Sequence, residues 1–412
     1  MRKKILVRGP FLSQSGYGAQ AMFALHAIKS QADKFEVFLI NTGWGATSWV
    51  TTDNKERKWI DETIQKTIRY VNEGGEFDIF LQVSIPNEAA QCAPVNILYT
   101  AGIETSRVAP VWIEKSALFD NIIVVSNHSK NVYLNTSYLA KDTRTGAETS
   151  ITCQTPIDVV NYPVDQPRKK EVTLDLEYDF NFLCMAQWGP RKNLANTVKW
   201  FVEEFIDQEV GLVVKTSIAN NCHMDKVASE ERLRFILNEY KDMKCKVYLL
   251  HGNMTRGEVY GLYNHPKIKS LVSLTHGECA GLPLFEAAGA GLPVIVPGWS
   301  GQADFLYVDK KPMFSDVKYS IAQIQPEAVW EGVLEAESQW AFPEQGSYKM
   351  NLRDMYKNYD VHLETAVELQ TYLKKNFTKR KMYGQFVDAV LKPFVVTKDE
   401  IDNWLDEIVI HD

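Results

Sequence analysis

The chain has few cysteines for its length, and none is arranged for metal binding or for a disulfide framework. Six cysteines are scattered over 412 residues. None forms a C-x-x-C pair or a cysteine–histidine cluster with the spacing of a zinc site. Scattered thiols are typical of reduced proteins of the cytoplasm, so we expect a cytoplasmic protein without disulfides.

Long hydrophobic runs are also missing. The N-terminus reads MRKKILVRGPF, and its apolar run is too short for the core of a signal peptide. No stretch approaches the roughly 20 apolar residues that a membrane helix needs. The sequence therefore predicts no membrane span.

An excess of positive charge is absent, and so is an obvious metal motif. The net charge of −7 gives no global signal for nucleic acid. No Asp-x-Asp motif follows a buried strand. The acids of 175–179 alternate, but they lack the glycine and the closing glutamate of a calcium loop. We therefore expect no metal site.

What is present is the pattern of two α/β domains. A chain of 412 residues exceeds one compact core. Short Val/Ile/Leu-rich segments alternate with helical patterns, which predicts two parallel, doubly wound sheets. The expected strands are 3–9, 35–41, 77–83, 95–100 and 121–126 in the first sheet, and 180–187, 211–217, 246–252, 269–275 and 292–298 in the second.

The stretch 161–179 is polar and interrupted by prolines, so it is the expected linker. We accordingly predict an N-terminal acceptor-side domain over 1–165 and a nucleotide-sugar-binding domain over 166–394. A C-terminal helix within 395–412 is expected to return toward the first domain. Ligands of such sheets bind at the carboxyl ends of the strands, so the cleft between the domains is the expected site.

The segment HGECAGLPLFEAAGAGLPVIVPG (276–298) carries two acids eight positions apart, Glu278 and Glu286. On one helix they would point about 80° apart. Pro283 suits the first turn of a helix, so we expect a helix from about Leu282, with Glu278 on the preceding loop. Both acids can then face one cleft, beside the free N–H groups of the helix start, which form an anion site.

The same spacing also fits an ordinary αβ unit without a functional role. Glu278, however, directly follows the predicted strand 269–275, which places it at the carboxyl edge of the sheet. That position favours a functional reading.

The residues 277–306, GECAGLPLFEAAGAGLPVIVPGWSGQADFL, resemble the signature of retaining glycosyltransferases of the GT-B fold, those of glycosyltransferase family 4 (glycosyl transferases group 1). Three further segments resemble the family in the same order: 15–21, 99–133 and 186–194. The resemblance spans about 1–310. It implies the GT-B fold, with two Rossmann-like domains facing a central cleft.

The resemblance implies roles for the signature residues. Glu286 would bind the ribose hydroxyls of a nucleotide-sugar donor, and Glu278 would face the donor sugar, because carboxylates accept hydrogen bonds from hydroxyls. The backbone N–H groups of Gly281, Leu282 and Leu284 would meet the diphosphate and the sugar.

Lys192 matches the family's diphosphate lysine, a fixed cation that would stabilise the charge of the leaving group. The sequence departs from the family at Gln187, where an arginine is usual. We expect Arg191 to supply that charge; the alternative is that Arg191 and Lys192 begin a solvated helix.

Further cleft residues are expected from their family positions. Gly16 and Gly18 would let the backbone approach the donor closely, although a plain turn also explains them. Glu104 would contact donor or acceptor, or else serve as an acid at a helix start. Lys215 would reach the nucleotide, or else lie on the surface.

The predicted function is a retaining glycosyltransferase that moves a hexose or similar sugar from a UDP- or GDP-linked donor to an acceptor hydroxyl. A front-face mechanism without metal or cofactor is expected. One alternative is an epimerase or phosphorylase on the same fold, although the chain is too short for a phosphorylase. Another is a non-catalytic module that binds nucleotide sugars.

The acceptor stays open. Glycans, proteins, small molecules and hydroxymethylated pyrimidines of phage DNA are all compatible with the first domain. Basic runs occur at 167–170 and 374–381, but a solvated helix face explains the second equally well. The acidic balance of the chain counts against DNA.

Overall fold

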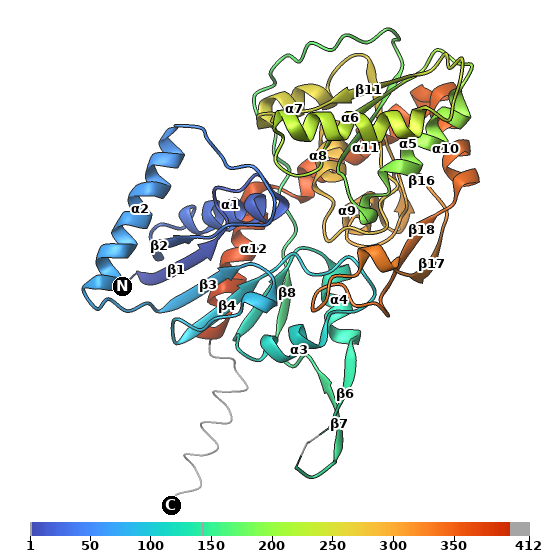
Figure 1. The fold of residues 1–412 in the computed structure, drawn as a ribbon. Coiled ribbons are helices and arrows are strands. Elements are labelled where there is room, and N and C mark those ends of the chain that lie inside the picture. The colour runs from blue at the N-terminus through green and yellow to red at the C-terminus, as the bar shows by residue number, and fades with distance from the viewer. Residues whose placement is uncertain (1, 142–143, 396–412) are drawn as a thin grey trace, which may run out of the picture.

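The computed structural model describes residues 2–141 and 144–395, which contain two six-stranded, fully parallel sheets (Figure 1). The first sheet has the strand order β2-β1-β3-β4-β5-β8 and the second β11-β10-β9-β12-β13-β16. Their strands are β1 (Lys3–Gly9), β2 (Phe35–Asn41), β3 (Ile79–Val83), β4 (Val95–Tyr99), β5 (Asn121–Val124), β8 (Ile157–Val159), β9 (Asn181–Gln187), β10 (Gly211–Ser217), β11 (Lys246–Leu250), β12 (Ile268–Val272), β13 (Val294–Val296) and β16 (Ser315–Asp316).

Helices cover the faces of both sheets, as parallel sheets require. They are α1 (Gly16–Lys29), α2 (Lys55–Asn72), α3 (Pro110–Ser116), α4 (Asn127–Asn135), α5 (Leu194–Phe205), α6 (His223–Leu237), α7 (Arg256–Tyr263), α8 (Leu282–Ala290), α9 (Ala303–Leu306), α10 (Gln345–Lys357), α11 (Tyr359–Asn376) and α12 (Lys379–Leu391). None of the helices in the described ranges combines the length and the apolarity needed to cross a bilayer.

The sheets confirm the predicted fold class of two doubly wound parallel sheets. The strands β1, β2 and β10 begin and end at the predicted residues, and every residue of β3 is buried. The other predicted strands are shorter in the structure. For example, β13 (Val294–Val296) excludes Pro293 and Pro297, which lack the N–H group that a strand ladder uses.

The segment 160–180 between the sheets contains no helix or strand. It runs along α7, where the Lys170 N–H donates to the Gly257 carbonyl at 3.0 Å. A Cβ atom on Gly261 would lie 1.9 Å from the Lys170 carbonyl oxygen, so only glycine allows this approach. The predicted domain boundary at 165/166 falls within this segment.

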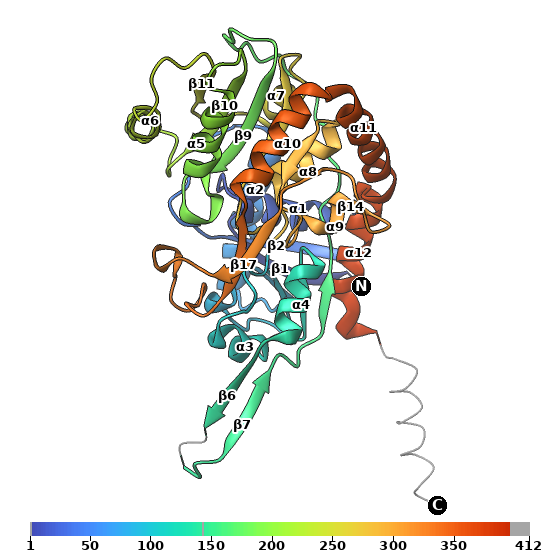
Figure 2. The same ribbon diagram turned by 90° about the vertical axis from the view of Figure 1, so that its right-hand side faces the viewer.

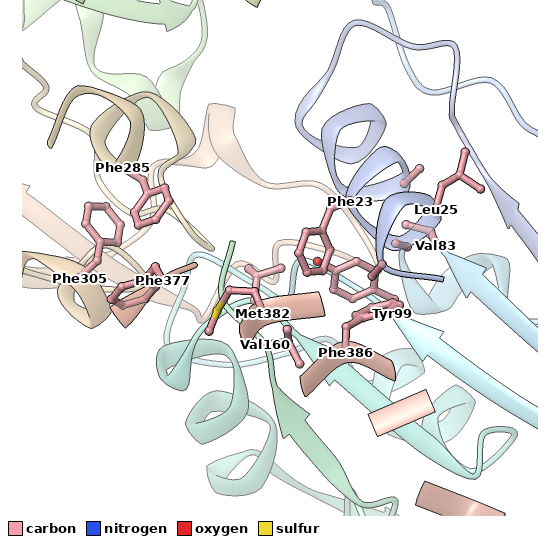
Figure 3. Packing of buried hydrophobic residues seen from close by; sticks show 14 of the residues in the cluster. Phe23, Leu25, Val83, Tyr99, Val160, Phe285, Phe305, Phe377, Met382 and Phe386 are labelled. Carbon is pink, nitrogen blue, oxygen red and sulfur yellow. The ribbon is translucent and has the colours of Figure 1, made fainter. Parts of the chain in front are cut away.

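The chain returns to the first sheet through α12. Phe386 of α12 packs against Phe23 and Tyr99, with ring centroids 5.3 and 4.9 Å apart (Figure 3). The Asn121 amide also donates to the Ala389 carbonyl at 2.9 Å. The sequence placed α12 in the second domain and expected the return from 395 onward. Apart from Val395, that last segment lies outside the described residues.

A short hairpin pairs β14 (Tyr307–Val308) with β15 (Lys311–Pro312) and was not predicted. Two longer hairpins also have no counterpart among the predicted strands. One is formed by β6 (Ser137–Lys141) and β7 (Glu148–Thr152), and it projects from the first domain (Figures 1 and 2). The other is formed by β17 (Tyr319–Gln323) and β18 (Gln339–Pro343); we call residues 319–343 the arm. It reaches from the second domain toward α3 and α4 of the first.

We predict that Phe386→Ala lowers the free energy of unfolding by about 3–5 kcal/mol, because the ring is fully buried and its loss leaves a cavity. Chemical denaturation followed by circular dichroism measures the change. Gln385→Ala, at an exposed position of the same helix, is the control and should stay within about 0.5 kcal/mol of the native protein. Equal effects of both substitutions would show that α12 is not part of the first domain's core.

Candidate active site

A network of four charged side chains joins the two domains at the carboxyl ends of their strands. Arg191 lies at its centre: its Nη2 atom is 3.2 Å from Glu104 Oε1, and its Nη1 atom donates to Glu278 Oε2 at 3.0 Å. Lys192 Nζ donates to Glu278 Oε1 at 2.5 Å. The structure thus brings together Glu104, Arg191, Lys192 and Glu278, the four residues predicted as catalytic.

Three strands position these side chains. Glu104 follows β4 of the first sheet, while Glu278 follows β12 of the second. Arg191 and Lys192 lie in the 3-10 turn η2 (Pro190–Lys192) after β9. Since β9 and β12 are neighbours in the second sheet, their ends present the cations and Glu278 side by side. This is the edge at which doubly wound sheets bind ligands.

Backbone hydrogen bonds fix the two loops of the second domain against each other. The Arg191 carbonyl accepts from the His276 N–H at 2.8 Å, and Arg191 Nη1 donates to the Gly277 carbonyl at 2.7 Å. The Glu278 N–H donates to Ser300 Oγ at 2.9 Å. The guanidinium therefore has a defined orientation in addition to its charge partners.

Electrostatics keep Glu278 ionised although its environment is buried. Burial acts to raise its pKa, but the Lys192 and Arg191 cations outweigh burial and hold the pKa at about 2. Burial acts to lower the pKa of Arg191, and Glu104 and Glu278 together raise it. Burial and the neighbouring Arg191 lower the pKa of Lys192. With all four groups ionised, two cations face two anions and their charges cancel.

The second acid of the signature lies on α8, as predicted. The helix spans Leu282–Ala290 with a proline in its first turn, and Glu278 lies on the preceding loop. Gly281 adopts the left-handed conformation (φ 77°) that lets the loop turn into the helix. The N–H groups of Leu282 and Leu284 belong to the first turn, where the helix itself offers no acceptor.

Glu286 Oε2 accepts a hydrogen bond from the Tyr263 hydroxyl at 3.2 Å. The Glu286 side chain is exposed to solvent, yet the surrounding protein raises its pKa by desolvation, with Arg256 acting in the opposite direction. The carboxylate is therefore accessible to solvent although protein surrounds it. Such an acid can accept hydrogen bonds from hydroxyl groups.

The two glycines after β1 have different environments. Gly18 is packed tightly: a Cβ atom there would lie 1.9 Å from the Ser13 carbonyl oxygen, and its N–H donates to Ser15 Oγ at 3.0 Å. A Cβ atom on Gly16 would meet nothing within 4 Å. Close packing accounts for Gly18, whereas Gly16 borders open space. Between them, the Tyr17 hydroxyl lies 3.0 Å from Thr100 Oγ1 at the end of β4.

Lys215 lies away from the network. Its Nζ atom donates to the Gly252 carbonyl at 2.7 Å and links the ends of β10 and β11, while β9 separates β10 from β12. Burial lowers the pKa of Lys215. Gln187 ends β9 and donates to the Ile218 carbonyl at 2.8 Å, so its neutral amide is engaged away from Glu278.

Sequence reasoning assigned no role to His276, but the structure gives it several partners. Its Nδ1 atom lies 2.6 Å from the Ala341 carbonyl oxygen, and its ring stacks on Trp340 with centroids 5.0 Å apart. Burial lowers the pKa of His276, which keeps the ring neutral at neutral pH. These partners lie more than 60 positions away in the sequence, so no local pattern could have revealed them.

The described residues contain no group of three His, Cys, Asp or Glu side chains placed to hold a metal ion. Metal independence of the reaction remains a prediction.

We predict that Glu278→Gln lowers stability in a pH-dependent way. The folded-state pKa of about 2 lies below the ordinary value of 4.5, so the charged carboxylate contributes stability that is present above pH 4.5 and is lost as the pH falls through about 2. The variant should be less stable by about 2–3 kcal/mol at pH 7, and the difference should shrink toward pH 3. Urea unfolding over this pH range measures it, with the exposed Glu239→Gln as the control. A difference that does not change with pH would contradict the assignment.

Comparison with known proteins identifies the architecture. No family model and no curated protein matches the chain. Solved structures do: sucrose-phosphate synthase from Thermosynechococcus elongatus has a TM-score of 0.63 at 12% identity, over 95% of this chain and 99% of that one. Anabaena HepE, solved with UDP and glucose, has a TM-score of 0.61 at 11% identity, over 95% of this chain and 100% of that one.

The lipopolysaccharide outer core galactosyltransferase WaaB has a TM-score of 0.53 at 11% identity, over 95% of this chain and 99% of that one. All three are GT-B glycosyltransferases. They share little sequence with this chain but match its two parallel-sheet domains along nearly the whole length. The resemblance stated from the signature residues is therefore confirmed at the level of architecture: this chain has the GT-B fold of glycosyltransferases.

Proposed function

We propose that this chain is a retaining glycosyltransferase that uses a UDP-linked sugar as donor. The observation that carries the proposal is the network in which Arg191 bridges Glu278 of the second domain and Glu104 of the first. Structures of the same fold support the choice of donor, since HepE has been solved with UDP and with UDP-glucose. GDP-linked sugars are the alternative donors, and the experiment described below includes them.

The diphosphate of the donor would compete for the cations of the network. Arg191 and Lys192 now donate to Glu278, and phosphate oxygens accept the same charge-assisted hydrogen bonds. Binding of the diphosphate would free the Glu278 carboxylate to accept from sugar hydroxyls. The first-turn N–H groups of α8 would add fixed positive potential beside it.

The ribose would bind at Glu286. Among the described residues, Tyr263 donates a hydrogen bond to the Glu286 carboxylate, which remains accessible to solvent. It therefore has capacity to accept from the two ribose hydroxyls.

The transfer step needs no side-chain base. The glycosidic bond to the diphosphate breaks, and the leaving phosphate oxygen takes the proton of the acceptor hydroxyl. That hydroxyl oxygen then bonds to the anomeric carbon on the same face, so the configuration is retained. Lys192 and Arg191 would stabilise the negative charge that develops on the leaving phosphate. Glu104 would hold the acceptor or the donor sugar. No cofactor or metal takes part in this scheme.

We predict that Lys192→Ala lowers kcat by about 100-fold or more, because a fixed cation at the leaving group stabilises the transition state more than the ground state. Steady-state kinetics with UDP-sugar measure the effect. Lys199→Ala removes an equal charge from an exposed ion pair and serves as the control. Parallel measurement of Arg191→Ala tests whether Arg191 supplies the charge missing at Gln187; an unchanged kcat there would refute that compensation.

The reaction itself is tested with a panel of UDP- and GDP-sugars in EDTA. We expect release of the nucleotide and, by NMR of the product, the same anomeric configuration as in the donor. Glycans are the first acceptors to include. In assays without an acceptor, hydrolysis of the donor sugar reports activity. An inverted product or a strict need for a divalent metal would overturn the mechanism. Tight nucleotide binding without release from any donor would instead indicate a non-catalytic binding module.

A further inference from the structure

The arm of the second domain is inserted into the core of the first. Val333, near its tip, is only 6% exposed and packs in the apolar cluster that contains Trp112. Beside it, the Gly332 carbonyl accepts from Asn87 Nδ2 at 2.9 Å, and Asn87 Oδ1 accepts from Trp112 Nε1 at 2.7 Å. The tip of the arm therefore has an apolar anchor and a polar one in the other domain.

A second contact lies next to the charged network. The Ser106 N–H donates to the Gln339 carbonyl at 2.9 Å, and the Gln339 N–H donates to Ser106 Oγ at 2.9 Å. Ser106 follows Glu104 by two positions on the same loop. The strand β18 thus fixes the loop from which Glu104 reaches Arg191.

The base of the arm is bonded to the donor-side loop. The Ala341 N–H donates to the His276 carbonyl at 3.0 Å, and His276 Nδ1 donates to the Ala341 carbonyl. Gln325 Nε2 lies 3.1 Å from His276 Nε2, which then accepts from the amide. His276 in turn donates its N–H to the Arg191 carbonyl, so the arm is connected to the backbone of Arg191 by two consecutive contacts.

We propose that the arm is a clasp that positions Glu104 against Arg191 across the cleft, with Val333 and Gln339 as positioning residues. It touches both sides of the ion pair: the Glu104 loop through Gln339, and the Arg191 loop through His276. The 3-10 turn η3 (Pro326–Ala328) of the arm also packs next to η2, which carries Arg191 and Lys192. The predicted effect of the arm on kcat rests on the proposed function, whereas its effect on the position of the Glu104 loop does not.

The clasp is distinct from the other connections between the domains. The segment 160–180 and α12 join the domains covalently, and Asp304 accepts from the Asn127 N–H at 2.8 Å. None of these contacts involves the Glu104 loop. The Cys279 thiol does hold the start of that loop, because it donates to the Gly102 carbonyl at 3.4 Å. Releasing the arm should therefore leave both domains folded, free the loop at Ser106, and change the alignment of the ion pair.

The test compares Val333→Asp with Val329→Asp. A carboxylate at position 333 would have to be buried in an apolar cluster, which is costly, whereas Val329 on the same arm is 40% exposed. Hydrogen–deuterium exchange of the substrate-free protein should become faster at 103–109 and 325–338 in Val333→Asp alone. Its kcat should fall by about 10- to 100-fold, with a smaller change in donor KM, because the charged groups lose their alignment. Unchanged exchange at 103–109 would overturn the clasp.

A milder pair of variants covers the case in which Val333→Asp fails to fold. Ser106→Ala removes the hydroxyl that accepts from Gln339, and Ser106→Thr retains it. We expect a several-fold loss of kcat and faster exchange at 103–109 with alanine, and recovery of both with threonine. Equal behaviour of the two variants would refute the role of Gln339. Because exchange is measured without substrate, an absence of transfer with every donor would refute the proposed function, while exchange still decides whether the arm is docked.

Discussion

The arrangement of this protein depends on one guanidinium that is shared between two domains. Arg191 has an acid from each sheet as a partner, and each acid follows the carboxyl end of a parallel strand. Burial opposes the charges of Arg191, Lys192 and Glu278, and the opposite charges of the network offset that cost. A change in the relative placement of the domains would therefore also change the ionisation equilibria of the site, because Arg191 has a partner in each domain.

Much of the fold could be predicted because its signals are local. The apolar segments that become β1, β2 and β10 are bounded by polar or glycine residues, and a proline indicates where α8 begins. The same proline placed Glu278 on the loop before that helix. Local chemistry was sufficient where an element is buried on both faces or where a turn requires a particular residue.

The parts that could not be predicted depend on partners distant in sequence. The strand β18 alternates weakly and is defined by its pairing with β17 and by its contacts to Ser106 and His276. The contact of Arg191 with Glu104 joins positions 87 apart, and only the packing of the two sheets decides it. The role of α12 was missed because nothing near this helix in the sequence indicates that Phe386 packs against Phe23 and Tyr99. Composition and periodicity show that a face is buried, but they do not show against which neighbour.

The return of α12 has a consequence for how the chain acquires its structure during synthesis. The first sheet is complete in sequence by Val159, yet its core includes Phe386 and a hydrogen bond to Ala389. A ribosome must therefore translate the entire second domain before the first can close its core. The second sheet, whose strands lie between residues 181 and 316, can assemble earlier. The first domain therefore completes its core only after α12 has been synthesised. This reverses the usual order, in which the N-terminal domain folds before the C-terminal one.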